Sequence, residues 1–174
     1  MVVGLFYYHC GMKIVSANVQ DIPVIQTIAA ETWPSAYGNI LSDDQIRYML
    51  DLFYNEEALA QQMKSEHHFI LAGDDGKNAG FVSFEHNYDG SKDTKLHKLY
   101  ILPLLQGNGA GHRLLEAVVA AAREAGQQRI ILNVNRHNIA LGFYKKYGFI
   151  IDREEDIDIG NGYFMNDYIL VLPL

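Results

Sequence analysis

The chain has 174 residues, of which 49% are hydrophobic and 20% are charged, the balance of a globular domain with one sizeable core. Its formal net charge of −7 argues against nucleic acid or an anionic membrane as the main partner, since both need a basic surface, and favours a cationic small molecule. A single cysteine, Cys10, leaves no disulfide framework and no cysteine cluster for zinc, so we expect a cytoplasmic protein.

Residues 1–11 form an apolar opening segment that is too short to span a bilayer. The segment also lacks the basic start and the cleavage site of a signal peptide. A second methionine, Met12, begins a sequence that has the pattern of a domain start. We therefore predict an N-terminal appendage or upstream extension at 1–11 and one domain at 12–174.

The first part of the domain predicts one strand and three helical segments. Residues 13–17 have the pattern of a strand, and Asn18 or Asp21 can cap a helix over 22–33. A capping box from Ser42 to Gln45 begins the next helix, and Asn55 caps a third.

The rest of the domain predicts three strands and then a strand–helix alternation. Two β-rich runs, 67–73 and 78–87, flank a hairpin signal at 74–77, and 94–102 forms the next strand. A helix over 109–125 stops at Gly126, and it is followed by a strand, a helix and two final strands at 129–135, 138–148, 149–159 and 163–174. Antiparallel strands followed by a βαβ crossover predict a mixed α/β sheet with helices on both faces.

The strand at 94–102 runs into a glycine-rich turn and then directly into a helix. Free backbone N–H groups and the positive end of the helix dipole meet there, which indicates a phosphate site. The dinucleotide fingerprint would need glycine at 112, where the chain has His112, and a P-loop would need Lys-Ser/Thr after Gly111. Both of those motifs are excluded.

Two motifs carry a resemblance to a known family. The run Gln106-Gly107-Asn108-Gly109-Ala110-Gly111 fits the Q/R-x-x-G-x-G/A pattern, and "NIALGFYKKYGF" at 138–149 matches the second signature of the same family. The chain thus resembles the GNAT acetyltransferase superfamily over 12–174, and looks most similar to bacterial spermidine/spermine N-acetyltransferases. The resemblance implies the GNAT fold: a single mixed, mostly antiparallel, twisted sheet of about six to seven strands, flanked by helices on both faces.

The resemblance also implies acetyl-CoA as co-substrate, no metal, and a set of site residues. Asn138 would bond the pantetheine region, and Tyr144 would lie near the thioester sulfur as general acid, although a packed aromatic is the alternative. The backbone would pair with pantetheine and cradle the pyrophosphate at Leu99, Tyr100, Ile101, Gln106, Gly107, Asn108, Gly109, Ala110, Gly111 and His112.

The general base is left open between two residues. His97 stands where the polyamine-acetylating relatives tend to carry Glu, and a histidine can accept a proton at neutral pH, although a structural role is the alternative. Glu85, on the neighbouring strand, is the other candidate base. His67 and His68 open a strand without a spaced third ligand, so we expect no metal site there.

The resulting hypothesis is transfer of the acetyl group of acetyl-CoA to a primary amine, by direct attack in a ternary complex. A small cationic amine or polyamine is the favoured acceptor, and the acidic residues of 152–159 could attract it or form only a charged hairpin. The alternatives are a protein or peptide N-acetyltransferase and a non-catalytic CoA-binding regulatory module. No nucleic acid or membrane partner is expected, and a homodimer through 163–174 stays open.

Overall fold

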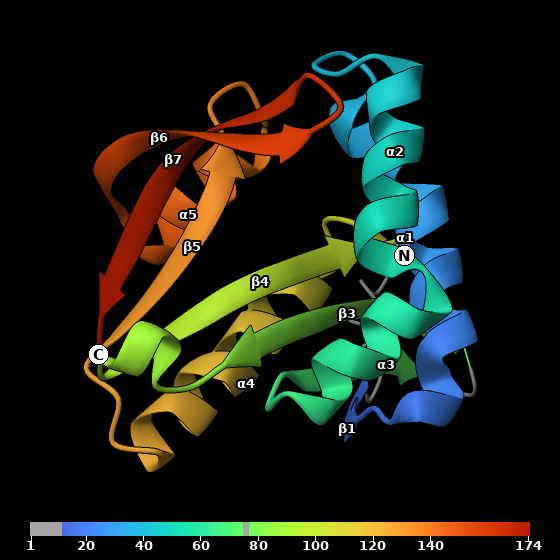
Figure 1. Cartoon of the computed structure of the whole chain (residues 1–174). Helices are drawn as coiled ribbons and strands as arrows, with labels where there is room; N and C mark the ends of the chain where they lie inside the picture. Colours follow the sequence, from blue (N-terminus) through green and yellow to red (C-terminus); the bar gives the residue numbers. More distant parts are fainter. Residues whose placement is uncertain (1–11, 75–76) are drawn as a thin grey trace, which may run out of the picture.

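The computed structural model describes residues 12–74 and 77–174 (Figure 1). The predicted appendage at 1–11 and the centre of the 74–77 hairpin lie outside these ranges. None of the described helices has the length and apolar character needed to cross a membrane.

The described chain forms one seven-stranded sheet, in the order β1-β2-β3-β4-β5-β7-β6. Neighbouring strands pair antiparallel except β4 and β5, which pair parallel across the α4 crossover. The predicted mixed, mostly antiparallel sheet is confirmed. Its strands are β1 (Lys13–Ser16), β2 (His68–Asp74), β3 (Lys77–Glu85), β4 (Asp93–Ile101), β5 (Arg129–Asn135), β6 (Ile150–Gly160) and β7 (Tyr163–Pro173).

Helices cover both faces of the sheet, as predicted (Figure 1). One face carries α1 (Ile22–Tyr37), α2 (Asp43–Tyr54) and α3 (Glu56–Lys64), which pack on a core that includes Phe81 and Leu71 of the sheet. The other face carries α4 (Ala110–Glu124) and α5 (Ala140–Tyr147), which pack on a second core that includes Val82 and Leu132. Short 3₁₀ turns lie at Val19–Asp21, Tyr88–Gly90 and Pro103–Leu105.

Side-chain caps mark the starts of α2 and α3. The Ser42 side chain accepts a hydrogen bond from the Gln45 N–H at 3.2 Å, and Asn55 accepts one from the Ala58 N–H at 2.8 Å. The predicted end of the first helix at residue 33 is wrong, because α1 continues through Pro34 to Tyr37. A proline removes one backbone donor, and burial of the preceding turn, which contains Thr32 and Trp33, offsets that loss.

The sheet opens between its two parallel strands. Pairing of β4 with β5 extends only from Asp93–Arg129 to Leu96–Leu132, and beyond that point the two strands diverge (Figure 1). The register of β3 against β4 also shifts, since Ser83 pairs with Lys98 while Phe84 pairs with Leu96. His97 is therefore the extra residue of a β-bulge, the kind of break that re-aims side chains next to a site.

Candidate active site

A cavity of about 1180 Å³ runs through the opening between β4 and β5. Its walls include the diverging part of β4, the glycine turn before α4, the start of α5 and the inner sides of α1 and α2. All the sequence-predicted site residues except Glu85 and Asn108 line it: His97, Leu99, Tyr100, Ile101, Gln106, Gly107, Gly109, Ala110, Gly111, His112, Asn138 and Tyr144.

The glycine turn presents an accessible backbone in front of α4. Gly107 and Gly109 have φ angles of +80° and +81°, in the left-handed region that favours glycine. A Cβ built on Gly109 would meet no atom of the described residues within 4 Å. Glycine is therefore favoured here by the backbone φ angle and not by lack of space. The turn leads directly into the first turn of the 15-residue helix α4, whose N–H groups have no intrahelical partners. This geometry fits a pyrophosphate.

The second motif lies at the N-terminal end and the inner side of α5. Asn138 is buried, and its side-chain oxygen accepts a hydrogen bond from the Ala140 N–H at 2.8 Å, which fixes the start of the helix. Tyr144 is 8% exposed and packs edge-on against Phe143 and Phe149. Within 12–74 and 77–174 no side chain or carbonyl bonds the Tyr144 hydroxyl, and burial holds its pKa well above the usual value for tyrosine. The phenol is therefore neutral at pH 7.

The two candidate bases form one cluster with a third residue. The Glu85 Oε2 atom lies 2.9 Å from His97 Nε2 and 2.7 Å from His67 Nε2. The two imidazole rings stack at 4.3 Å between centroids, and all three side chains are only partly exposed. His97 reaches the main cavity, whereas His67 lines a smaller cavity of about 470 Å³ near the start of β2.

Burial shifts the pKa values of this cluster in opposite directions. It lowers the pKa of His97, with a further decrease from His67, and it raises the pKa of Glu85. His97 is therefore a neutral imidazole at pH 7. The Glu85 carboxylate binds a proton more strongly than a solvent-exposed glutamate does, because its pKa is raised.

The same three residues bring potential metal ligands within 4.8 Å of one another. The two rings are, however, nearly parallel, with 12° between their planes. Glu85 forms a hydrogen bond with His97 and lies within ion-pair distance of His67.

Sequence reasoning missed two lysines in the cavity, Lys95 and Lys98. Lys95 is 9% exposed, bonds Asn133 and lies over the Tyr88 ring at 5.2 Å. Lys98 donates a hydrogen bond to the Gln62 side chain at 2.7 Å. Burial lowers the pKa of each lysine to about 8. Both lysines stand close to His97 in "KLHKLYI". Their orientation toward the cavity could not be predicted without knowledge of the β-bulge.

Asp167 of β7 was also missed. The side chain is 5% exposed, lines the cavity, and lies 3.4 Å from the Asn133 amide nitrogen. Burial raises the pKa of its carboxyl to about 6. The sequence 163–174 is largely apolar, and only the alternation with Met165 and Ile169, which also line the cavity, assigns Asp167 to this face.

Aromatic side chains cover the end of the cavity beneath the helices. Trp33, Tyr54 and Tyr100 lie within 6.3 Å of one another between ring centroids, and the Tyr37 hydroxyl lies 3.4 Å from that of Tyr100. The tip of the β6–β7 hairpin closes over this region, because Tyr48 of α2 donates a hydrogen bond to the Ile159 carbonyl at 2.7 Å.

The acidic residues of β6 are largely engaged by arginines. Arg136 pairs with Glu154 at 3.3 Å and with Asp156, and Arg153 lies 3.7 Å from Glu155. Among these acids only Glu155 lines the cavity. These two arginines thus contact most of the acids of β6, but acids outnumber them and the hairpin keeps an excess of negative charge.

Comparison with known proteins shows which family has these features. Residues 39–164 match the model of the acetyltransferase (GNAT) domain. An uncharacterized N-acetyltransferase of Mycobacterium bovis is 31% identical over 156 residues, with 88% of this chain and 98% of the relative covered. A spermidine N(1)-acetyltransferase of Thermoplasma acidophilum is 24% identical over 154 residues, which cover 85% of this chain and 94% of the relative.

Among solved structures, the PaiA N-acetyltransferase of Thermoplasma acidophilum in complex with coenzyme A superimposes with a TM-score of 0.80. The match covers 94% of this chain and 99% of that chain at 24% identity. The predicted fold class is confirmed by this likeness, whereas the similarity to spermidine acetyltransferases is only distant.

Proposed function

Because the chain belongs to the GNAT family and is an acetyl-CoA-dependent N-acetyltransferase, we propose that it acetylates a small primary amine by direct attack within a ternary complex. Acetyl-CoA supplies an activated acetyl group as a thioester. The single observation that supports this proposal best is the His97–Glu85 pair, which lies beside the strand opening and leads into the acceptor side of the cavity.

On the cofactor side, the turn from Gln106 to His112 would hold the pyrophosphate through backbone N–H groups. The unpaired edge of β4 at Leu99, Tyr100 and Ile101 would bond the pantetheine arm as an added strand. Asn138 would complete this contact. Tyr144, with a neutral hydroxyl that lines the cavity, would donate a hydrogen bond to the departing sulfur.

The acceptor amine must lose a proton, and the His97–Glu85 pair can take it. The Nε2 atom of His97 is engaged by Glu85, so Nδ1 is the ring nitrogen left to accept the proton from the amine. As Nδ1 is protonated, the Nε2 proton can move to Glu85, whose raised pKa favours holding it. The two alternatives of the sequence analysis thus become two parts of one base.

Several acceptor classes are compatible with this chemistry. A polyamine is supported by the net charge of −7 and by the distant spermidine acetyltransferase relative, but most acids of β6 already have arginine partners. A peptide acceptor would need space where the β6–β7 tip contacts α2. We favour a small amine, in a cytoplasmic protein.

The test is a comparison of His97→Gln, Glu85→Gln and the double variant with a matched control. His137→Gln serves as the control, since His137 is exposed and lies outside the cavity. Each single variant should lower kcat/KM for amine acetylation by about 100-fold or more, the usual contribution of a general base. The double variant should be little worse than the poorer single one, because both act in the same step.

Two results would contradict the proposal. Additive losses would mean that the two residues act separately. Unchanged turnover in both single variants, with acetyl-CoA still bound, would remove the pair from the mechanism.

A further inference from the structure

Lys98 lies in the cavity beside the proposed base, yet it has no acidic partner. No carboxylate oxygen of the described chain approaches its Nζ atom within 4.0 Å. An ammonium group has three N–H donors, and the Gln62 side chain accepts one of them at 2.7 Å. The other two have no hydrogen-bond acceptor among the residues described, so the group can still bind an anion.

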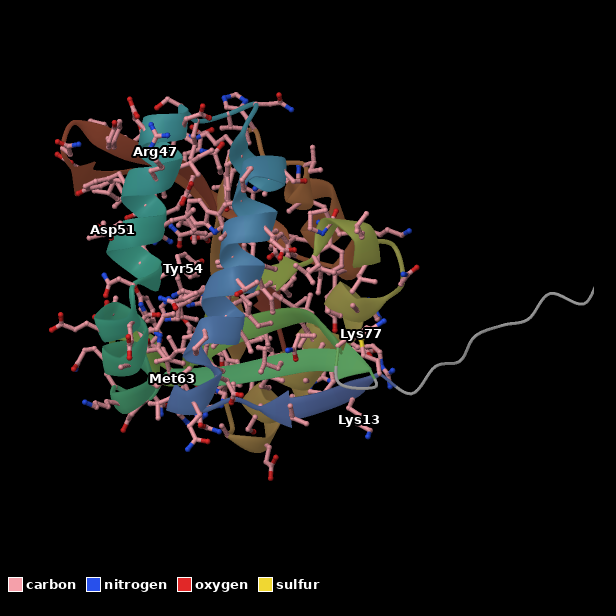
Figure 2. All side chains as sticks on the ribbon, turned by 90° about the vertical axis from the view of Figure 1, so that its right-hand side faces the viewer. Lys13, Arg47, Asp51, Tyr54, Met63 and Lys77 are labelled. Atoms are coloured by element: carbon pink, nitrogen blue, oxygen red, sulfur yellow. The ribbon has the colours of Figure 1, made fainter. Side chains whose placement is uncertain are left out.

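The surroundings hold this ammonium group in place. The Nζ atom lies over the rings of Tyr54 and Phe69, at 5.4 and 5.9 Å from their centroids (Figure 2 shows Tyr54 where α2 meets α3). Gln62 is itself oriented, because its amide nitrogen donates to the Phe53 carbonyl at 3.1 Å. Removing a charge from water without a counter-ion is costly, so a held, unpaired cation at a cavity wall indicates an anionic ligand.

The β-bulge places Lys98 next to the base. Leu96 and Leu99 belong to the core on the α4 side, whereas His97 contacts Glu85 and Lys98 contacts α3, so two consecutive side chains lie on the same face. Their Cα atoms are about 3.8 Å apart across one peptide bond. Both side chains also line the same cavity, so a small acceptor could contact His97 with its amine and Lys98 with a second group.

We propose that the acceptor carries a carboxylate close to its primary amine, and that Lys98 binds this carboxylate. This inference rests on the proposed function, because it specifies the substrate class of the same site. One ammonium group with two free donors matches a singly charged, two-oxygen anion. A second ammonium on the acceptor, as in a polyamine, would instead meet like charge from Lys98.

The first experiment compares acceptors that differ only in this charge. Phenylalanine and methionine are tested against phenylalaninamide and methioninamide, with spermidine as the dicationic comparison. At neutral pH a larger fraction of the amine is unprotonated, and so nucleophilic, in the amides than in the acids. A preference for the acids would therefore oppose the intrinsic reactivity of the two amines. We expect kcat/KM for the acids to exceed that for the amides by about 10-fold or more, and spermidine to be poorest.

The second experiment replaces the cation. In Lys98→Met, the ratio of kcat/KM for acid over amide should fall about 10- to 100-fold, the effect of a hydrogen bond to a charged group. Lys64→Met is the matched control, because Lys64 is exposed on α3 and outside the cavity, and it should keep the wild-type ratio. Equal turnover of acids and amides by the wild type would overturn the inference, as would an unchanged ratio in Lys98→Met.

Binding separates this inference from the proposed function. Calorimetric titration of CoA-saturated wild-type protein with the same acids and amides measures the charge preference without turnover. Tighter binding of the acids without acetylation of any amine would contradict the proposed function and support the anion site. Acetylation of amines with no preference for the acids in either assay would do the reverse.

Discussion

Asp167 gives a prediction about stability that can be worked from the structure. Burial raises the pKa of this carboxyl from 3.8 to about 6, so the folded protein favours the neutral acid. The stabilisation that comes with protonation is fully present below pH 3.8 and is lost as pH rises through about 6. The substitution Asp167→Asn keeps a neutral group at every pH.

The expected size follows from the shift. A change of about 2 pKa units corresponds to about 3 kcal/mol at 1.36 kcal/mol per unit, for a side chain that is 5% exposed. Asp167→Asn should thus be more stable than the wild type by up to about 3 kcal/mol at pH 8, and nearly equal to it at pH 4. For a domain of this size the gain corresponds to roughly 6–12 °C in Tm.

The assay is urea and thermal unfolding at pH 4, 6 and 8. Asp51→Asn is the control, because Asp51 is exposed on α2 and points away from the sheet (Figure 2). A stability difference for Asp167→Asn that does not change with pH, or a loss of stability at pH 8, would refute the reasoning. A gain at pH 8 accompanied by lower acetyl transfer would mean that the carboxylate is retained for function at a cost in stability.

Two further predictions concern the cofactor side. Tyr144→Phe should lower kcat by about 10-fold or more, because the hydroxyl would act on the leaving sulfur. The Kd for CoA, measured by calorimetry, should change by less than about 2-fold. Tyr163→Phe is the control, and an unchanged kcat in Tyr144→Phe would remove Tyr144 from the mechanism. Gly109→Val should abolish CoA binding, because a β-branched residue at φ +81° is strained by about 1–3 kcal/mol and its side chain would occupy the predicted phosphate site. The control Gly142→Val, on the exposed side of α5 with open space around it, should bind CoA normally. Equal CoA affinity in both variants would locate the phosphates elsewhere.

The glycine turn and the helix that follows Asn138 could be predicted from sequence because their geometry is local. The turn from Gln106 to Gly111 and the helix beginning near Asn138 are short continuous segments, and backbone φ angles and helix N-termini follow from nearby residues. The same reasoning located the caps at Ser42 and Asn55. It failed at Pro34, where tertiary burial of the helix outweighs a local breaker.

The acceptor side could not be predicted in the same way. His67 lies just before β2, Glu85 ends β3 and Lys98 belongs to β4, so their contacts depend on how these segments are placed side by side. The bulge at His97 breaks the alternation of side chains. A regular strand pattern would therefore place Lys98 on the face of the sheet opposite to His97, whereas the two side chains share one face. One register shift thus decides which charges face the cavity.

The most direct test of the central claim is release of CoA from acetyl-CoA, followed with a thiol reagent in the presence and absence of primary amines, with the product identified by mass spectrometry. The account predicts release that depends on the amine and yields a product one acetyl group heavier at nitrogen. Binding of CoA without amine-dependent release, across amino acids, small amines, polyamines and short peptides, would contradict it.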